Sequence, residues 1–121
     1  MSEEKACDIK IRAYHFSKAI INLISKTKIE RLYFSIVDQL IRSATSIGAN
    51  VVEAKAGSSR KDFRNFYTIA LKSANETKYW LCLIRDTEVI GVDKEIVKEL
   101  LKEVDEISKI IASIIININK E

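Results

Sequence analysis

Proline is absent from this chain, and only three of its 121 residues are glycine. Sheet-rich folds need many tight turns, and tight turns draw heavily on Gly, Pro, Asn and Asp. A chain with so few turn formers suits long helices joined by a few short connections. We therefore expect an all-α protein.

Residues that build metal centres and catalytic sites are also scarce. The chain has one histidine, His15, and two cysteines that are far apart, Cys7 and Cys82. Di-metal sites in helical bundles use Glu-x-x-His pairs, but Arg12 stands where that glutamate would be. We expect no metal, no cofactor and no enzymatic activity. An alternative is a ribonuclease built on Arg12 and His15, because "RAYH" is superficially similar to the Arg…His motif of helical HEPN-type ribonucleases.

Long hydrophobic runs are missing as well. The most apolar run covers residues 110–118, which is shorter than the ~20 residues that a membrane-spanning helix needs. The segment "MSEEKACDIK" at residues 1–10 is charged and has no apolar core of the kind found in secretory signals. Together with the isolated cysteines, these features predict a protein of the reducing cytoplasm.

Four segments carry apolar residues at alternating spacings of three and four, which is the period of amphipathic helices. We expect helices at about 8–27, 31–56, 60–87 and 94–119 within a single domain, 1–121. The breaks contain helix-ending and helix-starting residues, namely Gly57, Ser59 with Asp62 three positions later, and Asp93. Short connections make consecutive helices antiparallel neighbours, so the expected fold is an up-down-up-down four-helix bundle.

Two of these helices have apolar stripes wider than a small bundle requires. The extra residues are Ile36, Ile41 and Val52 in the second helix and Ile110, Ile115 and Ile116 in the fourth. A helix that is apolar around most of its circumference is buried on several sides. The extra faces indicate either a subunit interface or a thicker core, and the sequence leaves both open.

Small residues are concentrated in the stretch "IRSATSIGANVVEAKAGSSRKDF", residues 41–63. Gly48 and Gly57 lack the Gly-Lys-Ser/Thr ending of a phosphate-binding loop. We interpret the stretch instead as a thin helix that allows close packing, followed by a turn. Asn50 and Glu53 lie three positions apart, and Glu76 of the third helix could reach them. These three residues are candidates for a buried polar network.

Positive charge is concentrated in the middle of the chain. Residues 55–72 contain five basic residues and one acidic residue, whereas residues 93–121 contain five basic and seven acidic ones. Basic residues interleaved with aromatic ones bind RNA by neutralising phosphates and stacking on bases. The candidate residues are Arg42, Lys55, Arg60, Lys61, Arg64 and Lys72, with Phe63, Phe66 and Tyr67 among them. The alternative is that the aromatic residues belong to the core and the charges merely solvate one face.

The stretch "DQLIRSATSIGANVVEAKAGSSRKDFRNFYTIALKSANETKYWL", residues 38–81, resembles the four-helix-bundle proteins encoded in intervening sequences of bacterial large-subunit rRNA genes. The matching residues are Gln39, Leu40, Arg42, Ala44, Ser46, Ile47, Ala49, Asn50, Glu53, Gly57, Ser59, Phe63, Ser73, Glu76 and Leu81. Asp62 also matches, with Asp in place of Glu. Two positions depart from the family pattern, with Gly48 in place of Pro and Ala54 in place of Gly.

This resemblance implies a compact up-down bundle that assembles into a homopentamer and has no catalytic residues. The family also includes accessory proteins of diversity-generating retroelements, whose basic pentamers bind a reverse transcriptase and nucleic acid. The function expected from the sequence is a non-enzymatic oligomeric scaffold with a basic surface that binds RNA, a ribonucleoprotein or a reverse-transcriptase-type partner. The alternatives are a purely protein–protein scaffold and the HEPN-like ribonuclease.

Overall fold

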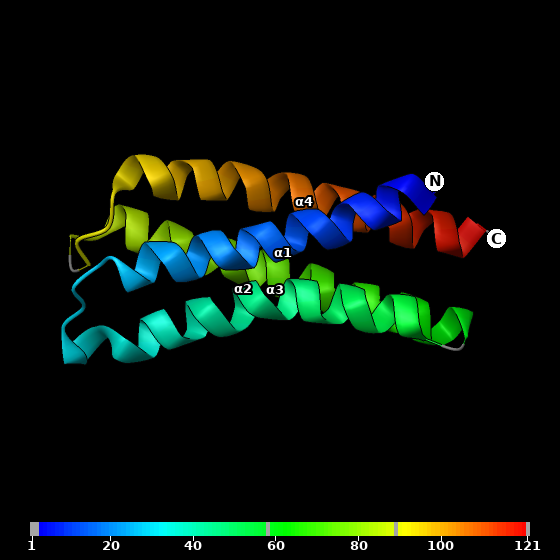
Figure 1. Cartoon of the computed structure of the whole chain (residues 1–121), viewed down its shortest axis with the longest axis horizontal. Coiled ribbons are helices and arrows are strands. Elements are labelled where there is room, and N and C mark those ends of the chain that lie inside the picture. The colour runs from blue at the N-terminus through cyan, green and yellow to red at the C-terminus, as the bar shows by residue number, and fades with distance from the viewer. Residues whose placement is uncertain (1–2, 58, 89, 121) are drawn as a thin grey trace.

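A computed structural model describes residues 3–57, 59–88 and 90–120 of the chain. Within these ranges the secondary structure is entirely helical, which confirms the all-α prediction. The elements are α1 (Glu3–Ser25), the 3₁₀ turn η1 (Arg31–Tyr33), α2 (Phe34–Ala56), α3 (Arg60–Asp86) and α4 (Lys94–Lys120). Consecutive helices run in opposite directions, and the turn between α2 and α3 lies at the same end of the molecule as both chain ends (Figure 1).

The helix boundaries differ from the sequence-based ones at two places. α1 begins at Glu3 rather than near residue 8, because Glu, Lys and Ala in this segment are good helix formers despite its low hydrophobicity. The second helix begins as the 3₁₀ turn η1 and becomes α-helical only at Phe34. A tighter first turn of this kind is common at helix N-termini.

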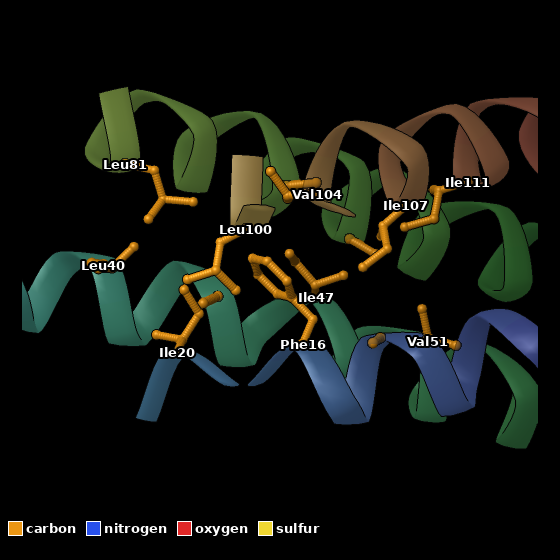
Figure 2. Packing of buried hydrophobic residues seen from close by; sticks show 14 of the residues in the cluster. Phe16, Ile20, Leu40, Ile47, Val51, Leu81, Leu100, Val104, Ile107 and Ile111 are labelled. Carbon is orange, nitrogen blue, oxygen red and sulfur yellow. The ribbon is translucent and has the colours of Figure 1, made fainter. Parts of the chain in front are cut away.

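The core is a single seam to which all four helices contribute. α1 and α3 occupy opposite corners of the bundle, and each packs against both α2 and α4. Figure 2 shows Phe16 beside Ile47 and Val104, with Leu40 and Leu81 facing each other further along the seam. Most apolar residues that recur at spacings of three and four are buried in this core, and Tyr33 and Phe63, which follow the same spacing, are partly buried against it.

The extra apolar residues of α2 and α4 do not all have the same role. Four of them, Ile36, Ile41, Ile110 and Ile115, pack partly against the core. Val52 and Ile116 instead remain 46% and 54% exposed. A thicker core thus explains four of the six extra apolar residues. Val52 on α2 and Ile116 on α4 are surface residues.

The helix ends follow the signals in the sequence. The Ser59 side chain accepts a hydrogen bond from the backbone N–H of Asp62 at 3.1 Å, and Asp93 Oδ1 accepts one from the backbone N–H of Glu95 at 2.9 Å. Gly57 ends α2 in an extended conformation, with φ at −63°. A Cβ atom at Gly57 would lie 3.1 Å from the carbonyl oxygen of Ala54, so this turn needs glycine for space rather than for a positive φ.

Gly48 offers a contrasting case within α2. A Cβ atom added there would lie 3.5 Å from Cβ of Ala13, which is an ordinary van der Waals contact. We expect Gly48→Ala to raise the free energy of unfolding by about 0.5–1 kcal/mol, because alanine is the better helix former. Urea denaturation followed by circular dichroism measures this change. Gly57→Ala is the control and should destabilise the protein; destabilisation by both variants would contradict the account of Gly48.

Lys94 holds the end of α3 at the start of α4. Its Nζ atom donates hydrogen bonds to the backbone carbonyl oxygens of Ile84, Arg85 and Thr87, at 3.2, 2.6 and 2.8 Å. A cation at this place satisfies carbonyl groups that the helix leaves without partners.

We expect Lys94→Met to lower the free energy of unfolding by about 1–2 kcal/mol, because it removes charge-assisted bonds to the α3 carbonyls. Urea denaturation again provides the measurement. Lys98→Met changes an exposed lysine one turn further along α4 and should have little effect. Equal decreases in the two variants would show that the hydrogen bonds of Lys94 to these carbonyls are not the cause.

Candidate nucleic-acid interface

The turn between α2 and α3 brings part of the predicted basic cluster together. Lys55 at the end of α2 and Arg60 at the start of α3 line the same shallow pocket of about 330 Å³, together with Gly57 and Ser59. Since Gly57 permits the tight turn and Ser59 fixes the first turn of α3, the turn itself sets the spacing of the two cations. We call Lys55, Arg60, Lys61 and Arg64 the basic end.

Lys61 and Arg64 extend the basic end along α3. Both side chains are exposed, and Nη1 of Arg64 lies 3.5 Å from Oδ1 of Asn119 near the end of α4. The cations therefore reach from the α2–α3 turn toward the last turn of α4. Asp62 is the acidic residue among them, and its backbone N–H is bound by the Ser59 cap.

Arg42 and Lys72 lie away from the basic end. Arg42 is thirteen residues before Lys55 on α2, or roughly 20 Å along a helix, and it forms an ion pair with Asp38 at 2.9 Å. Lys72 follows Arg64, the nearest member of the basic end on α3, by eight residues, or roughly 12 Å. The six predicted cations thus form one compact group of four and two outlying positions.

The aromatic residues near the basic end belong mainly to the core. Tyr67 is fully buried, and its ring packs edge-on against that of Phe63, with centroids 4.7 Å apart. Phe63 and Phe66 are partly buried against the core. These rings are therefore not a platform on which bases could stack, and any contact with RNA here would rest on charge.

The polar network between α2 and α3 differs from the predicted one. Glu53 and Glu76 are both exposed in the single chain, so the prediction that they are buried is wrong there. A carboxylate is costly to bury without a cation beside it, and Glu76 instead accepts a hydrogen bond from Nε1 of Trp80 at 3.1 Å. Asn50 is half-buried and donates to the backbone oxygen and the hydroxyl of Ser46, at 2.8 and 2.9 Å.

Short hydroxyl side chains make the actual network. The hydroxyls of Ser46 and Ser73 lie 2.9 Å apart, and those of Ser43 and Thr77 lie 3.0 Å apart. Thr77 also donates to the carbonyl oxygen of Ser73 at 2.7 Å. The sequence carries this signal as a run of small residues, several of which are serine or threonine.

Arg12 and His15 do not form a common site. Arg12 faces α4, where its guanidinium makes two hydrogen bonds to the Glu103 carboxylate at 2.6 and 3.0 Å. His15 is exposed and lines a groove between α1 and α2. The two side chains therefore point to different neighbours, and this arrangement weighs against a ribonuclease that uses both.

Ion pairs elsewhere link the helices. Asp105 of α4 accepts hydrogen bonds from Lys109 and from Lys78 of α3, both at 3.2 Å, and these cations lower the pKa of its carboxyl group. In the described part of the chain, no group of three or more His, Cys, Asp or Glu side chains is placed to hold a metal ion. Nor does any described helix combine the length and apolar character required to cross a membrane.

The chain is similar to known proteins in both sequence and fold. The model of a family described as 23S rRNA-intervening sequence protein matches residues 5–113. A crystal structure from Bacteroides thetaiotaomicron VPI-5482, described as a protein with unknown function from the S23 ribosomal protein family, is 38% identical in sequence. The match covers 92% of this chain and 97% of that one, with a TM-score of 0.79. No curated protein matches the chain.

The hydroxyl pair of Ser43 and Thr77 allows a direct test of the α2–α3 contact. We expect Thr77→Val to lower the free energy of unfolding by about 1 kcal/mol, because valine keeps the shape but loses the buried hydrogen bond to α2. Thr68 is the matched control, since it also donates to the carbonyl four residues earlier but is not buried. Equal effects of Thr77→Val and Thr68→Val in urea denaturation would contradict the role given to this pair.

Proposed function

Because the chain belongs to the 23S rRNA-intervening sequence protein family, we propose that it is a non-enzymatic, oligomeric scaffold whose basic end contacts RNA. The observation that carries this proposal is the exposed group Lys55, Arg60, Lys61 and Arg64 at one turn of the bundle. Phosphate contacts need exposed cations and no particular pocket, so this surface suits the RNA backbone better than a small molecule.

Self-association is the second part of the proposal. A four-helix bundle of this size leaves much apolar surface in water, and several large hydrophobic side chains are exposed here. In the homopentamer that the family resemblance implies, five basic ends would act together. Several cation groups on one particle bind a polyanion far more tightly than one group does.

The proposed partner is RNA, either in a ribonucleoprotein or together with a reverse-transcriptase-type protein. The proposed place of action is the cytoplasm. The protein needs no cofactor for this role, and none of its side chains is assigned a catalytic step.

A purely protein–protein scaffold is the second candidate. It is favoured by the burial of Phe63, Phe66 and Tyr67, since these rings add no stacking surface to the basic end. In that case the cations would only keep the particle soluble.

Binding to a structured RNA over a salt series separates the two candidates. We expect the wild-type protein to bind at low salt and to lose affinity steeply as salt rises, because counterions are released from the phosphates. The triple variant Arg60→Gln, Lys61→Gln, Arg64→Gln should reduce the slope of log K against log salt by roughly 0.7–0.9 for each phosphate that the variant no longer neutralises.

The matched control removes three positive charges from elsewhere on the surface. Lys28, Lys98 and Lys102 are exposed, and their replacement by glutamine changes the net charge by the same amount. This control should keep most of the affinity. Absence of binding by the wild-type protein at low salt, or an equal decrease in affinity in the two triple variants, would overturn the RNA proposal.

A further inference from the structure

One side of α3 carries a stripe of polar residues that the bundle does not use for packing. Six residues of this helix recur at spacings of four, three, four, three and four, which places them on one side of it. We call them the outer ridge. They are Lys61, Asn65, Thr68, Lys72, Asn75 and Tyr79. Five of the six are exposed, and Thr68 is partly exposed.

The outer ridge points away from the two helices that pack against α3. The Thr77 hydroxyl lies 3.0 Å from a hydroxyl of α2, and Nζ of Lys78 lies 3.2 Å from a carboxylate oxygen of α4. Each residue of an α-helix is turned by about 100° from the one before it, so Tyr79 is turned by about 200° from Thr77 and about 100° from Lys78. The ridge therefore faces solvent, and it extends over roughly 27 Å from Lys61 to Tyr79.

Positive charge continues from the basic end along the outer ridge. Lys61 belongs to both, and Lys72 follows it by eleven residues, or roughly 16 Å. Among the described residues, no ion pair or side-chain hydrogen bond engages either ammonium group. Arg64 lies beside the ridge on the side of α4, where it reaches Asn119. Three cations are thus available along one stretch of α3.

The acidic residues of this part of α3 lie to one side of the outer ridge. Asp62 precedes Ser73 by eleven residues, or about three turns, and Ser73 contacts α2, so Asp62 lies on the α2 side. Glu76 lies between that side and the ridge, and its carboxylate accepts a hydrogen bond from Nε1 of Trp80 at 3.1 Å. A chain of phosphates along the ridge would therefore meet cations and neutral polar groups.

Tyr79 ends the outer ridge with an exposed aromatic ring. It is 61% exposed, whereas the aromatic residues near the basic end belong mainly to the core. The ring of Trp80 packs against it at 5.0 Å between centroids, with the two planes 78° apart. Since Trp80 is itself partly buried against the core, it holds the Tyr79 ring in place at the surface. An exposed ring of this kind is a surface on which an unpaired base can stack.

Two amide side chains lie between the cations and this ring. Asn65 is placed between Lys61 and Lys72, and Asn75 between Lys72 and Tyr79. An amide both donates and accepts hydrogen bonds, so it can pair with a base edge or with a ribose 2′-hydroxyl. In duplex RNA the base edges of the major groove are out of reach of side chains. Cations, amides and a ring in one line therefore suit RNA whose bases are unpaired.

We propose that the outer ridge of α3 binds single-stranded RNA, with phosphates at Lys61, Arg64 and Lys72 and one base stacked on Tyr79. This inference rests on the RNA contact in the proposed function and names the class of RNA, an unpaired strand that runs from the basic end to Tyr79. Lys72, which lies away from the basic end, belongs to the same contact.

Affinities for a single-stranded RNA and for a fully paired duplex of the same length test this inference. The wild-type protein should bind the single strand more tightly. Tyr79→Ala should lower the affinity for the single strand by about 5- to 150-fold, which is the effect of removing the ring beneath one stacked base. Its affinity for the duplex should not change. Tyr79→Phe keeps the ring and should retain the wild-type affinity for both.

Tyr14→Ala is the matched control, because Tyr14 is 62% exposed but lies on α1. It should leave both affinities unchanged. With the single strand, Lys72→Gln should reduce the slope of log K against log salt by roughly 0.7. Tyr79→Ala should leave this slope unchanged, since it removes no charge. Circular dichroism confirms that each variant is folded.

The outcomes separate this inference from the proposed function. Equal affinities of the wild-type protein for the single strand and the duplex would overturn the inference alone, as would equal affinities of the wild-type protein and Tyr79→Ala for the single strand. A decrease in Tyr14→Ala equal to that in Tyr79→Ala would also overturn it. Failure of the wild-type protein to bind either RNA at low salt would refute the proposed function, and this inference with it.

Discussion

The close approach of α2 to both of its neighbours is the constraint on which the structure depends. Ser43, Ser46 and Gly48 are small, so α1 and α3 come near enough for Ala13 to touch Gly48 and for paired hydroxyls to bridge α2 and α3. Gly48 also lines the groove between α1 and α2, so the same small residue contributes to the packing of α1 on α2 and to the shape of the surface beside it.

The basic end depends on a different part of the same helix pair. Gly57 allows the chain to turn without steric conflict, and the Ser59 cap starts α3 at once. Lys55 and Arg60 are consequently held on either side of one turn, although neither is buried or needed for the core. The basic end therefore lies at one end of the bundle. An assembly of several copies would bring several basic ends together on one particle.

Much of the fold could be predicted from the sequence, because apolar period and cap residues act locally. The four helices, the Ser59 cap and the start of α4 after Asp93 follow from such signals. The polar network could not be predicted, since spacing alone does not say which of two polar faces a neighbouring helix covers; Glu53 points outward, whereas the hydroxyl of Ser43 points to α3. Likewise, Arg42 and Lys72 carry the same charge as the basic end but lie away from it. Their separation from it follows from the unbroken helices α2 and α3 that hold them.

The central claim is that the protein is an assembly of several copies, whose basic ends act together, rather than a single bundle. The native mass of the unmodified protein at micromolar concentration tests this most directly. The expected result is a uniform particle of several 13.8 kDa chains, with five as the number that the family resemblance implies. A particle with the mass of one chain at that concentration would contradict the claim.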